Sequence, residues 1–150
     1  MRGEEESVVF DAYIFKGILG VEPYDKVYSK ILQKNHALVM SAEMMEKYSK
    51  AIAKNNYSPA GALTIIQGEF QKLEAMQKLR WADKRIEKMK EDDVKVEIKD
   101  EDDIPFVKAA FASKAKYIVT QDEKHLLSKK GEFRKYQIEV MTPEEYIKIS

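Results

Sequence analysis

The sequence contains no cysteine and only two histidines, His36 and His125. Without cysteine the chain can have no disulfide framework, no thiolate metal site and no thiol nucleophile. A structural zinc site or a histidine triad would have to use nearly all of the histidine supply. A long apolar run is also missing, whereas a membrane-spanning helix needs roughly 20 apolar residues in succession. These absences leave the chemistry of this chain mainly to oxygen and amine side chains.

The chain is short and well charged. Its 150 residues are 44% apolar and 35% charged, which is typical of one globular domain, here residues 1–150. The acidic stretch at residues 4–6 is not followed by the hydrophobic segment of a signal peptide. We therefore expect a cytoplasmic protein that has no contact with a membrane.

There is no excess of charge of either sign, because 26 Lys and Arg residues balance 26 Asp and Glu residues. This balance excludes a nucleic-acid binder whose affinity comes from a large basic excess. The charges are nevertheless segregated, with a basic excess over residues 71–90 and an acidic excess over residues 91–103. A nucleic-acid enzyme with separate charged patches therefore remains open.

Short apolar runs alternate with stretches whose apolar residues recur every three or four positions. This pattern predicts strands separated by helices, hence βαβ units and a mainly parallel sheet. Residues 60–90 have the helical spacing throughout and are expected to form two helices or one bent helix. The expected strands are residues 8–10, 37–40, 94–98, 117–119 and 138–140.

Acidic side chains follow the expected strands. Asp11 ends the first strand and Asp122 follows the fourth, while Glu46 and Asp103 lie in or at the start of the helices after the second and third strands. Parallel strands place their carboxyl ends at one edge of the sheet, where ligands bind. A cluster of carboxylates suits Mg²⁺ or Mn²⁺, and these ions support phosphodiester hydrolysis. Taken singly, each acid has an alternative interpretation as a helix cap or a solvated surface residue.

Short segments that contain these acids, and others along the chain, form a recognisable set. They are VVFD at residues 8–11, LVMS at 38–41, EKY at 46–48, DEDDIPF at 100–106, KYIVTQD at 116–122 and TPEEY at 142–146. Together these segments resemble the PIN-domain family, and the resemblance covers essentially the whole chain. The most specific part is the stretch from residue 100 to residue 127.

The resemblance implies a Rossmann-like three-layer α/β/α fold with a parallel five-stranded sheet. It also implies an endoribonuclease that depends on Mg²⁺ or Mn²⁺ and hydrolyses RNA. Many members are VapC-like toxins that pair with an antitoxin protein, and many form homodimers. Asp11, Glu46, Asp103 and Asp122 match the acidic positions of the family, as catalytic residues and metal ligands. Thr120 matches the polar residue that accompanies the last acid.

The chain departs from the family pattern directly after the first acid. The family usually has Thr or Ser and then Asn there, whereas this chain has Ala12 and Tyr13. Gln121 stands where a small residue is more usual. Losing the hydroxyl and the amide removes hydrogen bonds of a kind that commonly matter 10–100-fold to a metal site. The alternative function is therefore a catalytically weak or inactive module that binds RNA or protein.

The expected helix over residues 60–90 includes Arg80, Trp81 and Arg85. These side chains are candidates for guiding an RNA backbone and stacking a base. The alternative is a solvated amphipathic helix in which Trp81 is partly packed. The same helix is also a candidate surface for a homodimer or an antitoxin segment.

Overall fold

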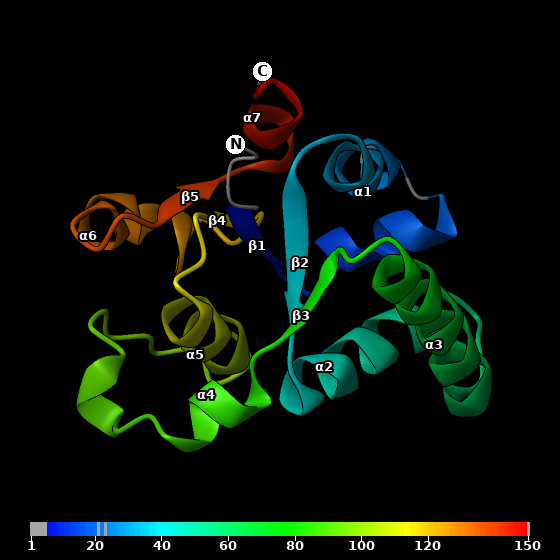
Figure 1. Cartoon of the computed structure of the whole chain (residues 1–150), viewed down its shortest axis with the longest axis horizontal. Coiled ribbons are helices and arrows are strands. Elements are labelled where there is room, and N and C mark those ends of the chain that lie inside the picture. Colours follow the sequence, from blue (N-terminus) through cyan, green and yellow to red (C-terminus); the bar gives the residue numbers. More distant parts are fainter. Residues whose placement is uncertain (1–5, 21, 23, 150) are drawn as a thin grey trace.

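The computed structural model describes residues 6–20, 22 and 24–149, and its centre is a parallel β-sheet (Figure 1). The sheet has five strands in the order β3-β2-β1-β4-β5. Every neighbouring pair of strands is parallel. The strands are β1 (Glu6–Phe10), β2 (His36–Met40), β3 (Leu79–Trp81), β4 (Tyr117–Val119) and β5 (Glu139–Met141).

Helices cover both faces of the sheet, which gives the three-layer α/β/α arrangement that the resemblance implies. Figure 1 shows α1 and α3 on one side of the sheet and α5 and α6 on the other. The α-helices are α1 (Tyr24–Gln33), α2 (Ala42–Ala53), α3 (Pro59–Ala75), α4 (Asp83–Glu87), α5 (Ile104–Ser113), α6 (Lys130–Arg134) and α7 (Pro143–Ile147). The 3₁₀ turns are η1 (Ile14–Leu19), η2 (Glu91–Asp93) and η3 (Leu127–Lys129).

The central strands are apolar because both of their faces are buried. Val8, Val9 and Phe10 of β1 are fully buried, and every residue of β2 is buried. Such continuous apolar runs are typical of parallel strands that lie between two layers of helices. The predicted strands at residues 8–10, 37–40, 117–119 and 138–140 are confirmed to within a residue or two at their ends.

Side-chain capping fixes the start of several helices, among them α2 and α7. The hydroxyl of Ser41 accepts a hydrogen bond from the backbone N–H of Met44 and so begins α2. Thr142 and Glu145 form a reciprocal capping box at the start of α7. Such caps satisfy backbone N–H groups that a helix leaves without partners.

The third strand along the chain, β3 at Leu79–Trp81, lies outside the range of residues 94–98 that was predicted for it. The expected continuous helical stretch over residues 60–90 is wrong, because α3 ends at Ala75 and the chain then forms β3. Gln77 takes a left-handed conformation with φ 59°, which reverses the chain and lets Leu79 pair beside Leu38 of β2. Only Leu79 of this edge strand is buried, so three residues provided too little alternation to distinguish a strand from a helix.

The strand expected at residues 94–98 does not form. Val96 is buried in the core, while Val94 and Ile98 pack against it with part of their surface exposed. The alternating pattern of this segment therefore reflects an extended chain that turns apolar side chains toward the core and has no strand partner in the sheet.

The order of the strands creates a crevice at the centre of the sheet. The chain leaves β1 toward β2 and leaves β4 toward β5, so the connections diverge between the neighbouring strands β1 and β4. In open α/β sheets ligands bind outside the carboxyl ends of the strands at such a point. Asp11 follows β1 and Asp122 lies shortly after β4, so both reach this crevice.

Candidate metal centre

A cavity of about 840 Å³ opens at the carboxyl ends of β1 and β4. Carboxylates line one part of it, including the three predicted acids Asp11, Asp103 and Asp122. Lysines line another part, among them Lys47, Lys50 and Lys54 of α2 and its C-terminus. The cavity therefore combines an acidic region with a basic wall.

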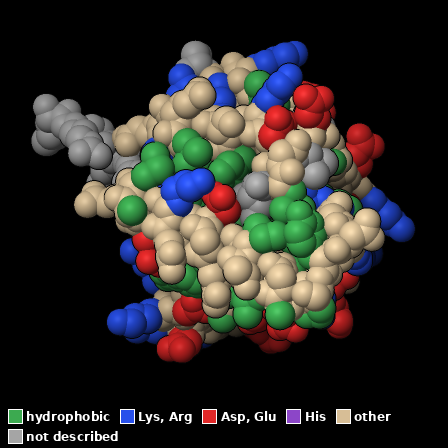
Figure 2. Space-filling model, turned by 90° about the vertical axis from the view of Figure 1, so that its right-hand side faces the viewer, with side chains coloured by type: hydrophobic (Ala, Val, Ile, Leu, Met, Phe, Trp, Pro, Cys, Tyr) green, Lys and Arg blue, Asp and Glu red, His purple; other side chains and the backbone are tan. Residues whose placement is uncertain are grey.

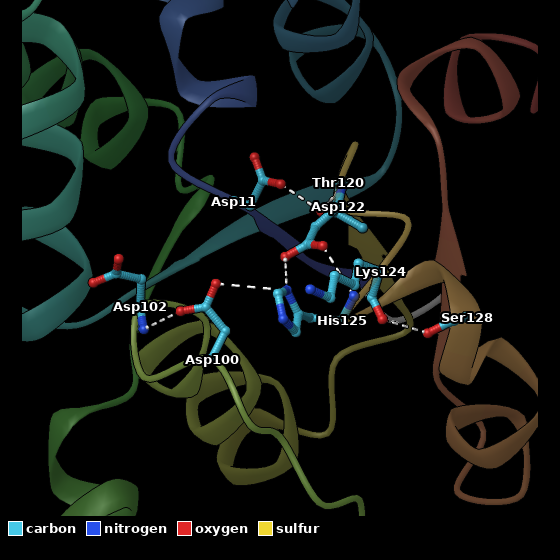
Figure 3. A network of polar contacts seen from close by, with 8 residues as sticks. All are labelled: Asp11, Asp100, Asp102, Thr120, Asp122, Lys124, His125 and Ser128. Atoms are coloured by element: carbon cyan, nitrogen blue, oxygen red, sulfur yellow. Dashed lines mark hydrogen bonds and ion pairs between the residues drawn. The ribbon is translucent and has the colours of Figure 1, made fainter.

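Asp11 is fixed by hydrogen bonds to both of its carboxylate oxygens. Its Oδ1 accepts from the backbone N–H groups of Tyr13 at 3.0 Å and Ile14 at 3.1 Å. Its Oδ2 accepts a short hydrogen bond from the Thr120 hydroxyl, as Figure 3 shows. Burial raises the pKa of Asp11, while these hydrogen bonds lower it. Asp11 thus caps the turn after β1, and it also links that turn to β4 through Thr120.

A second group of ligand atoms is gathered around Asp122. One ligand atom from each of Asp100, Asp103, Asp122 and His125 lies within 4.8 Å of every other. The His125 Nδ1 is 3.3 Å from Asp122 Oδ2 and 3.6 Å from Asp100 Oδ2 (Figure 3). The backbone N–H of His125 also donates to Asp122 Oδ1 at 3.0 Å, so a tight turn holds the two side chains together.

Asp103 is the most perturbed carboxyl of this cluster. Burial and the neighbouring carboxyl of Asp122, with further contributions from Asp100 and Asp11, raise the pKa of Asp103 to about 8. Burial alone would raise the pKa of Asp122, but the Asp103 carboxyl and hydrogen bonds from His125 lower it below its usual range. Crowded carboxyls separate their pKa values in this way because they cannot all ionise in one place.

The arrangement of Asp103 fits a divalent cation. Its side chain is buried at the start of α5, and its Oδ2 has no hydrogen-bond partner in the described part of the chain. A buried carboxylate oxygen without a partner is costly. Carboxylate oxygens with one imidazole nitrogen form a donor set that suits a hard or borderline divalent ion.

Glu46 lies apart from the other predicted acids. Its side chain is 69% exposed and pairs with Lys50 one turn further along α2. Glu46 does not line the cavity, whereas the next residue, Lys47, does and donates to Asp102 at 2.7 Å. On a helix one residue corresponds to a rotation of about 100°, which is why adjacent residues face different surroundings.

The residues that depart from the family pattern lie at the cavity. Ala12, Tyr13 and Gln121 all line it. Tyr13 is 57% exposed, and the Lys16 ammonium lies 4.5 Å from the centre of its ring. Gln121 accepts a hydrogen bond from the Tyr24 hydroxyl at 2.6 Å, which joins α1 to the loop that carries Asp122. Tyr13 is therefore a side chain of the cavity wall and is not part of the core.

The three residues considered for RNA contact are not found on one helix. Arg80 and Trp81 belong to the edge strand β3, and Arg85 lies on α4. Trp81 is 46% exposed, and its ring packs edge-on against Phe70. None of the three lines the cavity that holds the acids.

Sequence reasoning did not place Asp100 or His125 among the site residues. Asp100 and His125 complete the cluster around Asp122. The spacing of His125 three residues after Asp122 was a usable signal, because a turn after a strand brings such positions together. The lysines 47, 50 and 54 were also overlooked, although their spacing places them on one face of a helix.

Comparison with known proteins supports the resemblance. A family model described as the PIN domain matches residues 7–124, which include the cavity acids and the loop after β4. A search of curated proteins gives no match. The matched region spans more than half of the chain, and the three-layer fold with its parallel sheet agrees with it. This chain therefore belongs to the PIN-domain family, whose members are generally nucleases.

Proposed function

We propose that this protein is an endoribonuclease that depends on Mg²⁺ or Mn²⁺. The observation that carries the proposal is the buried Asp103 Oδ2, which has no hydrogen-bond partner among the described residues and lies beside Asp122 at the cavity. Asp11 lines the same cavity, so all three acids face one space. Membership of a family of nucleases supports hydrolysis of a phosphodiester as the reaction.

The acids of the cavity have separate tasks in this proposal. Asp103 and Asp122 would hold the cation directly, and Asp11 would do so with lone pairs that its hydrogen bonds leave available. A bound divalent ion acidifies a coordinated water and stabilises the oxygen that leaves phosphorus. Thr120 orients the Asp11 carboxylate and accepts from the Asp122 backbone N–H at 3.0 Å, so it positions both acids. Glu46, which the resemblance assigns to the site, would act only through water.

The lysines of α2 supply the surface for a polyanion. Lys47, Lys50 and Lys54 line the cavity beside the acids, and Lys50 and Lys54 are exposed. They would contact phosphates on either side of the scissile one. Tyr13 presents an exposed ring at the same cavity, where an unpaired base can stack. These contacts favour single-stranded RNA as the substrate. Contact of more distant parts of the RNA strand with Arg80, Trp81 and Arg85 stays a prediction.

Cleavage of fluorescent RNAs with Mg²⁺, Mn²⁺ or EDTA tests the proposal. Wild type should cleave only with an added divalent ion. Asp103→Asn and Asp122→Asn should each reduce activity by more than about 100-fold. That value is the upper end of the loss expected when a residue that only hydrogen-bonds a metal ligand is replaced. Glu101→Gln is the matched control, because Glu101 is an exposed acid of the same turn that does not line the cavity. Cleavage that survives EDTA and both Asn variants would contradict a metal-dependent mechanism.

The alternative function, a weakly active or inactive binding module, rests on Ala12 and Tyr13. The exposed Tyr13 ring occupies part of the cavity wall where the family usually has Asn. If wild type cleaves none of a varied set of RNAs but Tyr13→Asn does, the natural sequence has an impaired site. Activity of wild type that Tyr13→Asn lowers would instead make Tyr13 a substrate contact.

The biological setting is also part of the proposal. We propose a cytoplasmic VapC-like toxin whose growth inhibition an antitoxin relieves, and a homodimer as its form in solution. Among the described residues, no helix combines the length and hydropathy that a bilayer crossing requires. On the face that carries α1 and α3, apolar patches lie between charged side chains that gather mainly toward the rim (Figure 2). Light scattering of the purified protein and induction in a growing host test the dimer and the toxicity.

A further inference from the structure

The geometry points to His125 as a nitrogen ligand that makes this site selective for Mn²⁺ and similar transition ions over Mg²⁺. The inference deepens the proposed function and rests on it, because it concerns the ion at the same cavity. It adds Asp100 and His125 to Asp103 and Asp122, two of the acids that the family pattern supplies. These four side chains offer three carboxylates and one imidazole, and Asp11 lines the same cavity.

The distances place His125 among the carboxylates. Its Nδ1 faces two acids at once, with Asp122 Oδ2 at 3.3 Å and Asp100 Oδ2 at 3.6 Å. Figure 3 shows the ring between these two side chains, which come from different segments of the chain. All four ligand atoms, that of Asp103 included, lie within 4.8 Å of one another. A single ion can therefore replace the contacts that the imidazole now makes with the two acids.

A second, independent observation points to a ligand at this place. Asp103 is 92% buried, lines the cavity, and has an Oδ2 without any partner in the described structure. The contacts of His125 with Asp100 and Asp122 leave this oxygen unsatisfied. An ion shared by the cluster would satisfy it, which a purely structural contact between His125 and Asp122 does not do.

The side chain of His125 is also dispensable for the local turn. The turn is held by the His125 backbone N–H, which donates to Asp122 Oδ1, and by the Leu126 and Leu127 N–H groups, which donate to the Asp122 carbonyl. The donors of these bonds are backbone N–H groups, so we expect the turn to form when the imidazole is replaced. The side chain of His125 is partly buried beside Asp100 and Asp122, so its contribution lies in the ring nitrogen.

An imidazole ligand has a definite chemical consequence. Mg²⁺ prefers oxygen ligands and keeps much of its water. Affinity for a nitrogen ligand rises from Mn²⁺ toward the later first-row ions, and all of these accept imidazole more readily than Mg²⁺ does. Without His125 the cluster contains only carboxylates, which discriminate less between these ions. Selectivity for Mn²⁺ over Mg²⁺ therefore reports the nitrogen ligand specifically.

Pulsed electron paramagnetic resonance of Mn²⁺ bound to the full chain tests the inference directly. We expect imidazole nitrogen coupling in wild type and its absence in His125→Gln. Titrations should show Mn²⁺ affinity falling about 10–100-fold in this variant, while Mg²⁺ affinity changes less than about threefold. Glu101→Gln, an exposed neighbour of the cluster outside the cavity, should leave both affinities unchanged.

A measurement on wild type keeps the test valid if His125→Gln does not fold. Protein labelled with ¹⁵N only in histidine should change the coupling pattern of bound Mn²⁺. The other histidine, His36, begins β2 and bonds to Tyr146, whereas the cavity lies at the carboxyl ends of the strands, so the signal is assigned to His125. Bound Mn²⁺ without imidazole coupling overturns the inference and leaves the proposed nuclease intact. A chain that binds no divalent ion overturns both.

Discussion

The buried carboxyl of Asp103 lowers the free energy of unfolding of the metal-free protein. We predict that Asp103→Asn raises the free energy of unfolding of the metal-free protein at neutral pH. The side chain is buried, and its Oδ2 has no hydrogen-bond partner among the described residues. The amide of Asn has nearly the same shape, brings N–H groups that can donate to Asp122, and stays uncharged at a pH where the Asp103 carboxyl ionises.

The magnitude follows from the cost of the unsatisfied group. A buried polar atom without a partner costs about 1–3 kcal/mol, and that range is the expected gain in unfolding free energy. For a chain of this length, the gain corresponds to a rise in Tm of roughly 3–9 °C. The lowered pKa of Asp122 favours the folded wild type and offsets part of this cost.

The effect should depend on pH in a definite direction. The pKa of Asp103 is about 8 in the folded chain and is 3.8 for an ordinary Asp. Between these values the folded state holds a proton that the unfolded chain has released, so this group's contribution to stability falls as pH rises. It is complete below about pH 4 and is lost by about pH 8. The Asn variant does not titrate there, so its advantage should grow over this interval.

Thermal or urea unfolding in EDTA at several pH values measures this advantage. Adding Mn²⁺ should then raise the Tm of wild type much more than that of Asp103→Asn, because a ligand stabilises only the state that binds it. The reasoning is refuted if Asp103→Asn destabilises the metal-free protein at pH 8, or if the difference between the two proteins does not change with pH.

Three further predictions concern other parts of the molecule. Burial lowers the pKa of His36, so the unfolded chain binds a proton at this residue more readily than the folded chain does. The free energy of unfolding should therefore fall as the pH drops below about 6.5. Unfolding of His36→Gln measured at several pH values should show a smaller fall. Thr120→Val should reduce cleavage about 10–100-fold by freeing the Asp11 carboxylate, with unchanged RNA affinity in fluorescence anisotropy. Exchanging Lys50 and Lys54 for Glu should weaken RNA binding and reduce the slope of log affinity against log salt by about 0.7 for each phosphate contact that is lost.

The central part of the fold could be predicted because it is buried on both faces. The strands β1, β2 and β4 each contain a run of three or four consecutive apolar residues that are buried, and such runs have few other uses in a short chain. The edge strand β3 could not be recognised, since two of its three residues are exposed and its apolar positions continue the spacing of α3. What separates them is the left-handed residue Gln77, a residue type that gives no turn signal of its own.

The candidate site was predictable where the topology alone determines position. Asp11 and Asp122 follow parallel neighbours in the sheet, so both had to reach the same edge. Asp103 joins them because α5 begins there and α5 contacts β1 and β2. Glu46 depends on the rotation of α2 about its axis, which motif spacing does not determine, and the structure turns Lys47 and Lys50 toward the cavity while Glu46 stays exposed.

The net charge of the chain is zero, but the charges at the cavity are separated into an acidic and a basic region. The acids around Asp103 would repel a phosphate, and the lysines of α2 would attract one, yet both line the same space. A cation held by the acids would reverse the sign of one part of the cavity and leave the lysine wall unchanged. The charge that a strand of RNA meets there would then be set by the bound ion, which no count of residues includes. Binding of the strand and its hydrolysis should therefore depend on different residues, the first on the lysines and the second on the acids.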